Sequence, residues 1–450
     1  MMNYTIFIIL FVLLSAVYLY LGYLSSKKVK TQSDFFLAGR GLTLWPLSLT
    51  LIATQLGGGA ILGVSDAAYQ YGIYGVFYTL GICLGFAALA MGAASKLRSF
   101  NVGTTAQLFE KLYGSPFLRK VASILSILSM FGIFLGQVVA SRKFMLGIGV
   151  ESEFIFFVFW GVVIAYTVLG GLKAVVSTDV FQVIFILIVF TAIFLFVMAQ
   201  DAFVPTNFFQ MFSLRAGSDL SELNYTGLLL LPFLFSFLEQ DLAQRFFAAK
   251  DQRTARVSAG ISSIILLVFA LIPVYFGVTA RDFGAIDSSR SVLMVFMEHT
   301  VGTIAVAFVA CGLLAAIIST ADSLLCAISS NMTLDFEGRF FKKDRLLLSK
   351  IVTCIVGVGT LFLGRYFDNI LSILIQSYEF PICALFVSVI ACFFVKRGLC
   401  KEAAGVSIFA GLGACFYFHL YPTVFPREIL SLLISLMGYG VGMLWNRRKG

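Results

Sequence analysis

Residues 53–63 read ATQLGGGAILG and place three consecutive glycines, Gly57 to Gly59, inside a long apolar run. A membrane span has to satisfy its backbone hydrogen bonds within the helix, and each glycine lowers helix propensity by about 1 kcal/mol against alanine. The stretch therefore predicts a membrane helix that is interrupted near its middle, where backbone groups become available to an ion or a solute. Close packing of two helices through small residues is the alternative explanation.

The composition is that of a polytopic membrane protein. Of 450 residues, 60% are hydrophobic and 12% are charged, against about 25% charged residues in soluble domains. The net charge of +9 is attributed to cytoplasmic loops rather than to a nucleic-acid partner. The two histidines and eight cysteines show no metal-ligand spacing, and no catalytic or ATP-binding motif occurs. We therefore expect a protein that is not an enzyme and that uses an ion gradient.

The hydropathy pattern predicts an all-α chain with about thirteen transmembrane helices in one domain, residues 1–450, without a water-soluble domain. Each segment is near the ~20 residues that cross about 30 Å of hydrocarbon. The segments lie at residues 4–23, 43–63, 73–95, 119–147, 153–170, 174–199, 226–244, 257–280, 302–331, 348–364, 369–395, 402–420 and 428–445.

The distribution of basic residues predicts the orientation of the chain. Most of the 32 Lys and Arg residues fall in every second loop, for example within residues 96–120 and 245–256. Because basic residues collect on the cytoplasmic side, the N-terminus is expected outside and the C-terminus in the cytoplasm. The compact loops are typical of a bacterial inner membrane protein.

Two segments place polar side chains inside apolar spans. In residues 315–323, AAIISTADS, the hydroxyls of Ser319, Thr320 and Ser323 surround Asp322, which favours a cation site or a proton relay over simple packing. In residues 166–182, a Gly-Gly turn precedes Asp179 at the start of the next span. Asp179 could bind a second cation, or it could cap its helix or pair with Lys173.

A second interruption is expected near Glu239. The run LEQDLAQR, residues 238–245, begins while its span is still crossing, although it could also be the cytoplasmic end of that helix. The basic side chain of Arg245 favours a cytoplasmic helix end for the last residues of this run. The two interruptions lie five spans apart, which is the spacing of two inverted five-helix repeats that each open with a broken helix.

Taken together, four segments resemble the solute:sodium symporter family over nearly the full chain. The match is carried by DFFLAGRGLTLWPLSLTLIATQLGGG (34–59), AYTVLGGLKAVVSTDVFQ (165–182), QRFFAAKD (244–251) and AAIISTADSLL (315–325). The resemblance implies a LeuT-type core of ten helices in two inverted repeats, at about 43–395. One extra helix (4–23) would precede the core, and two accessory helices (about 402–445) would follow it.

The resemblance also implies the coupling ion and its ligands. A main Na⁺ site is expected between the first and eighth core helices, held by the backbone carbonyls of Ala53, Leu56 and Ala316 and by the hydroxyls of Ser319 and Thr320. A possible second Na⁺ site would use Asp179, Asp322 and Ser323.

The solute is expected at the first interruption. The resemblance suggests that it binds Thr54, Gln55, Gly57, Phe77, Tyr78, Gln137, Glu239 and Gln376. Residues 73–95 contain no acidic residue, unlike the sugar-transporting members. Choline is disfavoured because the three tryptophans, Trp45, Trp160 and Trp445, are peripheral and Gln55 stands where that branch would place an aromatic residue. The proline branch has an acidic residue at the position of Gln55, so proline is possible but not indicated. Amino acids or organic acids are favoured.

The expected function is Na⁺-coupled symport of a small organic solute by alternating access. A proton-coupled or Na⁺-independent transporter, with Asp179 and Asp322 relaying protons, is the alternative. A choline symporter remains a further option, and a solute sensor without transport is disfavoured because only about five residues follow the last span. The partners are the solute and the lipid bilayer, and the oligomeric state stays open, with a monomer as one option.

Overall fold

The interruption predicted at Gly57–Gly59 is present. Helix α3 (Leu44–Gln55) ends at Leu56, where φ is −80° and ψ is 39°. The chain then resumes as a wide helical turn, Gly59–Gly63, that continues into α4 (Val64–Tyr71). A side chain at Gly57 would place its Cβ atom 2.6 Å from Oγ1 of Thr320, so the glycine permits a close approach to another helix.

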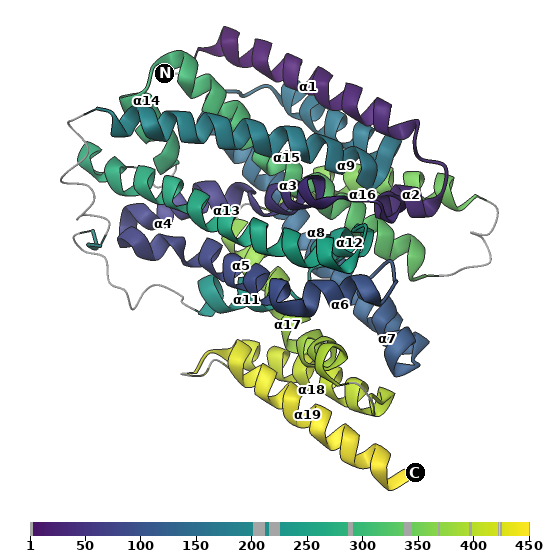
Figure 1. The fold of residues 1–450 in the computed structure, drawn as a ribbon. Coiled ribbons are helices and arrows are strands. Elements are labelled where there is room, and N and C mark those ends of the chain that lie inside the picture. The colour runs from purple at the N-terminus through teal and green to yellow at the C-terminus, as the bar shows by residue number, and fades with distance from the viewer. Residues whose placement is uncertain are drawn as a thin grey trace.

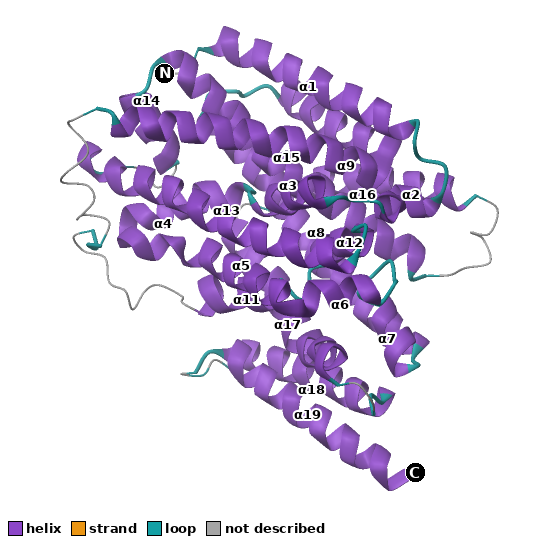
Figure 2. Ribbon diagram, viewed as in Figure 1, coloured by secondary structure: helices purple, strands orange, loops and turns teal. Residues whose placement is uncertain are grey.

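The computed structural model describes residues 3–200, 212–215, 226–286, 291–336, 344–367, 370–395, 398–421, 423 and 425–449. The described chain is helical, with no strand beyond one isolated bridge between Leu42 and Ala249 (Figure 2). Besides α3 and α4, its α-helices are α1 (Tyr4–Ser26), α2 (Gln32–Leu37), α5 (Phe77–Ala88), α6 (Ala94–Ser99), α7 (Gln107–Tyr113), α8 (Pro116–Gly147), α9 (Glu153–Met198), α11 (Leu231–Phe235), α12 (Gln240–Ala248), α13 (Gln252–Thr279), α14 (Val292–Thr300), α15 (Thr303–Leu334), α16 (Arg345–Leu363), α17 (Ile370–Phe394), α18 (Lys401–Leu420) and α19 (Arg427–Lys449).

Ten helices of the described chain are long and apolar enough to cross a membrane. The predicted count of thirteen is not confirmed, for two physical reasons. The predicted spans 153–170 and 174–199 follow each other without a loop and are counted together as α9, although the non-helical Gly171 separates them into two helical segments. The predicted spans 43–63 and 226–244 are each divided by a break, so that α3, α11 and α12 are individually short.

The second interruption, expected near Glu239, is also present. The chain turns as a wide helix over Thr226–Leu230, continues as α11, leaves the helix at Ser236, and restarts as α12 after Glu239. The restarted half, α12, packs against α3 and α15 in the middle of the bundle (Figure 1). The two broken helices therefore meet inside the protein.

Gly171 is required by the bend in α9. Its φ of +53° and ψ of −143° suit only glycine, and a Cβ atom there would lie 2.3 Å from the backbone oxygen of Phe35. We expect Gly171→Ala to lower the melting temperature in detergent clearly, because strain of about 1–3 kcal/mol adds to the collision. Gly161→Ala in the same helix meets nothing within 4 Å and is the matched control. Equal melting temperatures for the two variants would contradict this reading.

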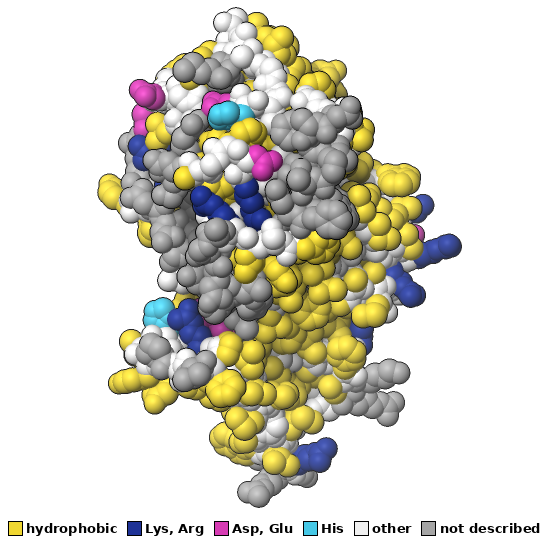
Figure 3. All heavy atoms as spheres, turned by 90° about the vertical axis from the view of Figure 1, so that its left-hand side faces the viewer, with side chains coloured by type: hydrophobic (Ala, Val, Ile, Leu, Met, Phe, Trp, Pro, Cys, Tyr) yellow, Lys and Arg dark blue, Asp and Glu magenta, His cyan; other side chains and the backbone are white. Residues whose placement is uncertain are grey.

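Apolar side chains form both the interior and the outer surface. Most of α15 is buried, with an unbroken run of buried residues from Val309 to Asn331, so this helix lies at the centre of the bundle. The flank visible in Figure 3 is covered by hydrophobic side chains, as a surface in contact with lipid requires. Examples from the described chain are Ile188, Leu195 and Ile264, which are each at least 60% exposed.

Helices α18 and α19 pack against each other and against α17. Arg427 of α19 forms a two-point ion pair with Glu379 of α17, with both N–O distances at 2.7 Å. Glu379 lies within the predicted eleventh span and is 1% exposed, so this pair fixes the last two helices to the bundle. The two chain ends lie towards opposite ends of the bundle in Figure 1.

Candidate ion and solute site

The site begins where α3 meets α15, beside the first break. Ser319 donates a hydrogen bond from Oγ to the backbone oxygen of Ala53 at 2.9 Å, and Thr320 donates from Oγ1 to the backbone oxygen of Thr54 at 3.0 Å. Both hydroxyls also approach the oxygen of Ala316, at 3.0 and 3.3 Å. The contact exists because α3 ends at Leu56 and no longer needs these carbonyls for its next turn.

These groups have the chemistry of a monovalent cation site. The set consists entirely of neutral oxygens, two hydroxyls and three carbonyls, within hydrogen-bond distance of one another. Hard oxygen donors from unwound backbone and neighbouring hydroxyls are the ligands that Na⁺ takes in transporters with broken helices. Ala53, Ala316, Ser319 and Thr320 are thus brought together, and Leu56 is the residue at which the helix breaks. The residues present fit Na⁺.

A layer of polar side chains, centred on Arg245, lies next to this candidate cation site. The guanidinium is fully buried and contacts Oδ2 of Asp179 at 3.0 Å and Oγ1 of Thr50 at 2.8 Å. It also donates to Ser323. Asp322 accepts a hydrogen bond from the hydroxyl of Tyr166 instead. A fixed cation therefore stands between Asp179 and Ser323, so these residues fit a second Na⁺ less well than the first set fits Na⁺.

Two sequence expectations about this layer are wrong. Arg245 does not lie at a cytoplasmic helix end, because the break before α12 returns the chain to the interior and buries the guanidinium. Lys173 pairs with Asp34 at 2.7 Å rather than with Asp179. Asp34 lies outside the spans, and the hydrogen bond from Lys173 is the main reason that its pKa falls to about 2.

Five of the eight predicted solute residues lie around the two breaks. Gln55, at the end of α3, donates from Nε2 to the carboxylate of Glu239 at 3.1 Å, which connects the first break to the second. The hydroxyls of Tyr78 in α5 and Tyr378 in α17 lie 2.9 Å apart. The ring of Tyr378 contacts that of Phe235 in α11, with centroids 4.7 Å apart.

Gln137 of α8 completes this region. Its Oε1 atom is buried, has no hydrogen-bond partner among the described residues, and lies 3.5 Å from where a Cβ atom of Gly57 would be. On the other side of the break, the ring of Tyr78 lies 3.4 Å from where a Cβ atom of Gly59 would be. An unpaired acceptor is thus aimed at the break.

Three of the predicted solute residues lie elsewhere. Thr54 uses its hydroxyl for Thr50 and Ser323, within the polar layer. Phe77 packs against Tyr74 and the small apolar cluster between α4 and α13. Gln376 is exposed at the start of the described part of α17. Tyr378 and Phe235 were not predicted to belong to the site. The one feature of the sequence that pointed to Tyr378 is its position beside Glu379 in an apolar span.

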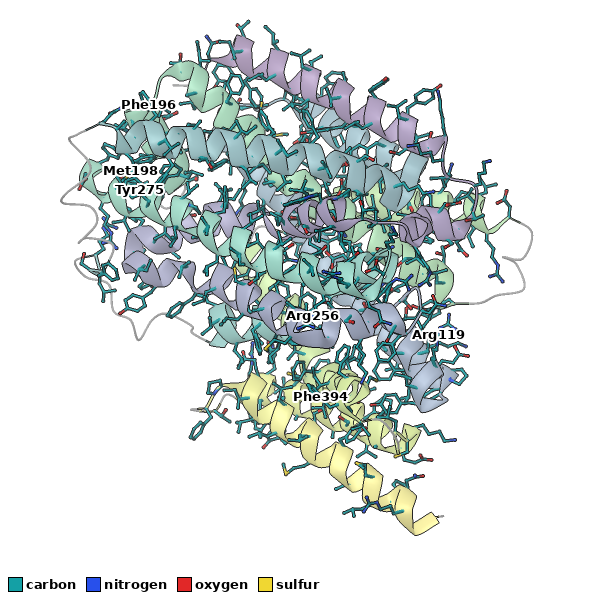
Figure 4. All side chains as sticks on the ribbon, viewed as in Figure 1. Arg119, Phe196, Met198, Arg256, Tyr275 and Phe394 are labelled. Carbon is teal, nitrogen blue, oxygen red and sulfur yellow. The ribbon has the colours of Figure 1, made fainter. Side chains whose placement is uncertain are left out.

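Two broken helices that meet in the middle of an apolar bundle, with polar groups at both breaks, define a membrane transporter. Figure 4 shows the side chains that fill the bundle between Tyr275 near one end and Arg119 near the other. The chain belongs to the Sodium:solute symporter family, whose model matches residues 35–401. It is a transporter and not an enzyme, and it is an integral membrane protein.

Curated relatives agree with this assignment. The chain is 25% identical over 373 residues to the osmoregulated proline transporter OpuE of Bacillus subtilis (strain 168), covering 77% of this chain and 75% of the relative. It is 22% identical over 407 residues to the uncharacterized symporter YwcA of the same organism, covering 85% and 79%.

Solved structures show the same fold. A Na⁺-coupled sialic acid symporter in its substrate-bound outward-open state superposes with a TM-score of 0.76 at 16% identity, over 97% of this chain and 96% of that one. MHP1, a nucleobase-cation-symport-1 family transporter, superposes with a TM-score of 0.64 at 14% identity, over 93% and 96%. The predicted LeuT-type fold is therefore confirmed.

Proposed function

We propose that this protein couples the inward movement of Na⁺ to the uptake of a small organic solute, with an amino acid or organic acid favoured. The main observation in support is the contact of Ser319 and Thr320 with the carbonyls of Ala53 and Thr54 at the first break. OpuE, a similar protein, is a proline transporter, and the superposed sialic acid symporter is Na⁺-coupled, which supports an organic solute and this ion.

In this proposal the ion and the solute act on the same two elements. Na⁺ between α3 and α15 would hold these helices in the outward-open arrangement, because its ligands come from both. The solute, bound beside Gln55 and Glu239, then contacts both broken helices and favours closure. Release inside follows from the low cytoplasmic Na⁺ concentration, so the gradient drives net uptake.

The proposed arrangement is a single transmembrane domain over residues 1–450, with the ten-helix core at about 43–395 between the helix 4–23 and the helices at about 402–445. The N-terminus is outside and the C-terminus is in the cytoplasm of a bacterial inner membrane. The charge pattern supports this orientation, because the basic segments at 96–120 and 250–256 lie on the same side in alternate connections, although Arg245 itself is buried.

The test is solute-dependent uptake of ²²Na⁺ into proteoliposomes. The purified chain is reconstituted, and amino acids, organic acids, choline and sugars are added outside in turn. At least one solute is expected to accelerate Na⁺ entry, and an imposed Na⁺ gradient is expected to concentrate that solute inside. Solute uptake that is equal with Na⁺ and K⁺ outside would overturn Na⁺ coupling.

Proton coupling is the second candidate, because two buried carboxyl groups, those of Glu239 and Asp241, lie next to each other. Both side-chain oxygens of Asp241, in the first turn of α12, are buried and have no hydrogen-bond partner among the described residues. A carboxylate in such a place requires a proton or a cation. Solute uptake driven by an acid-outside pH gradient without Na⁺, and lost in Asp241→Asn, would favour this candidate over Na⁺.

A further inference from the structure

We infer that Glu239 is a recognition site for a protonated amine, so that the transported solute carries a primary or secondary ammonium group. This inference rests on the proposed function and narrows its solute class. It starts from the carboxylate at the second break, which lies beside the first break and is 8% exposed.

The carboxylate of Glu239 has a neutral donor, Gln55, and a second buried carboxyl group, that of Asp241, beside it. Although Glu239 is the residue before α12, its side chain makes no capping hydrogen bond to that helix. Among the ion pairs of the described residues, none includes Glu239. The nearby guanidinium of Arg245 is bonded to Asp179, Thr50, Ser323 and the backbone of Asp241. Gln55 provides a neutral donor, so no basic side chain among the described residues forms an ion pair with Glu239.

The groups around the breaks accept hydrogen bonds and favour positive charge. Oε1 of Gln137 is a buried acceptor with no partner in the described chain, aimed at the first break. The rings of Tyr78, Tyr378 and Phe235 form a connected aromatic wall. Aromatic faces attract a desolvated cation, and a hydrogen bond between an ammonium group and a carboxylate is about twice as strong as a neutral one.

The charged residues near the breaks indicate that the site recognises an amine of the solute rather than an acid group. The segments that supply these side chains are residues 44–95, 121–141, 226–240 and 370–395, and they contain no Lys, Arg or His. A solute carboxylate would therefore meet no basic side chain from these segments, and it would be repelled by Glu239. An ammonium group meets one carboxylate, one unpaired amide oxygen and an aromatic wall.

Matched solute pairs test the inference in proteoliposomes that hold the full chain under an inward Na⁺ gradient. Each pair keeps the carbon skeleton and removes the amine: L-proline with cyclopentanecarboxylate, and L-alanine with propionate, within a panel of all common amino acids. The amine-bearing member of a transported pair is expected to have at least a tenfold lower half-saturating concentration. Uptake of the amine-free member with equal affinity would overturn the inference.

Variants at Glu239 assign the effect to this residue. Glu239→Gln is expected to raise the half-saturating concentration of the amine solute at least tenfold and that of Na⁺ less than twofold, whereas Glu239→Asp, which keeps the charge, recovers part of the loss. Glu153→Gln removes a carboxylate that is 48% exposed at the start of α9 and should change neither value.

The results of these experiments distinguish a failure of the amine site from a failure of the proposed Na⁺ symport. Na⁺ entry coupled to an amine-free solute, unchanged in Glu239→Gln, contradicts the amine site and leaves symport standing. Amine uptake that depends on Glu239 but not on Na⁺ supports the amine site and contradicts Na⁺ coupling. If no amine in the panel is taken up, the inference is wrong.

Discussion

The double variant Ser319→Ala/Thr320→Ala is expected to lose Na⁺-driven uptake, with an apparent Na⁺ affinity at least about 100-fold below that of the natural protein. The two hydroxyls are the side-chain oxygens of α15 that contact the backbone carbonyls of Ala53 and Thr54 in α3. A hydrogen bond or ligand contact to a charged group contributes about 1.5–3 kcal/mol, and each 1.4 kcal/mol is tenfold in affinity. The measurement is initial solute uptake as a function of external Na⁺.

Two controls separate ion binding from general damage to α15. Ser329→Ala removes a buried hydroxyl from the same helix, one that bonds to its own helix at Leu325, and should leave the Na⁺ dependence unchanged. Thr320→Ser keeps the hydroxyl and should remain close to the natural protein. An unaltered half-saturating Na⁺ concentration in the double variant would show that the coupling ion binds elsewhere.

The second large effect concerns the stability of the fold. Arg245→Gln is expected to lower the free energy of unfolding by about 3–5 kcal/mol, because it leaves the buried carboxylate of Asp179 without its positive partner. The double variant Arg245→Gln/Asp179→Asn should recover part of that loss, since it also removes the uncompensated charge. Unfolding in mixed micelles of rising denaturing-detergent content provides the measurement.

An exposed ion pair gives the matched control. Arg142 contacts Glu153 at 3.0 Å, the same distance as Arg245 to Asp179, but the two side chains are 38% and 48% exposed. Arg142→Gln is therefore expected to cost about 1 kcal/mol or less. Similar losses in Arg245→Gln and Arg142→Gln would mean that the buried pair does not hold the broken helix in place.

The breaks in the fold could be predicted because their causes are local. Three adjacent glycines weaken a helix whatever surrounds it, and Gly57–Gly59 became the first break. The polar run from Glu239 predicted the second break for a similar reason. The course of the chain after that break could not be predicted, since it depends on Asp179, a distant residue that α12 meets only in the folded bundle. A basic residue after a polar run is usually a helix end, and that rule misplaced Arg245.

The structure brings together the predicted ion residues more closely than the predicted solute residues. Ser319 and Thr320 lie within one motif, so their position on α15 follows from the sequence. The choice of Gln376 over Tyr378 depended on the rotation of α17. Residues two apart on a helix point in nearly opposite directions. The sequence does not fix which of them faces the breaks, and the resemblance suggested the exposed amide.

The ion pair between Glu379 and Arg427 has a practical consequence for anyone who shortens this protein. A minimal version that stops after α17 would retain Glu379, which is 1% exposed, but would lose the guanidinium that neutralises it. Such a truncation removes two peripheral helices, and it leaves an unpaired carboxylate on the face of α17 that they covered. Any trimmed version for crystallography or biosensing should therefore carry Glu379→Gln from the outset.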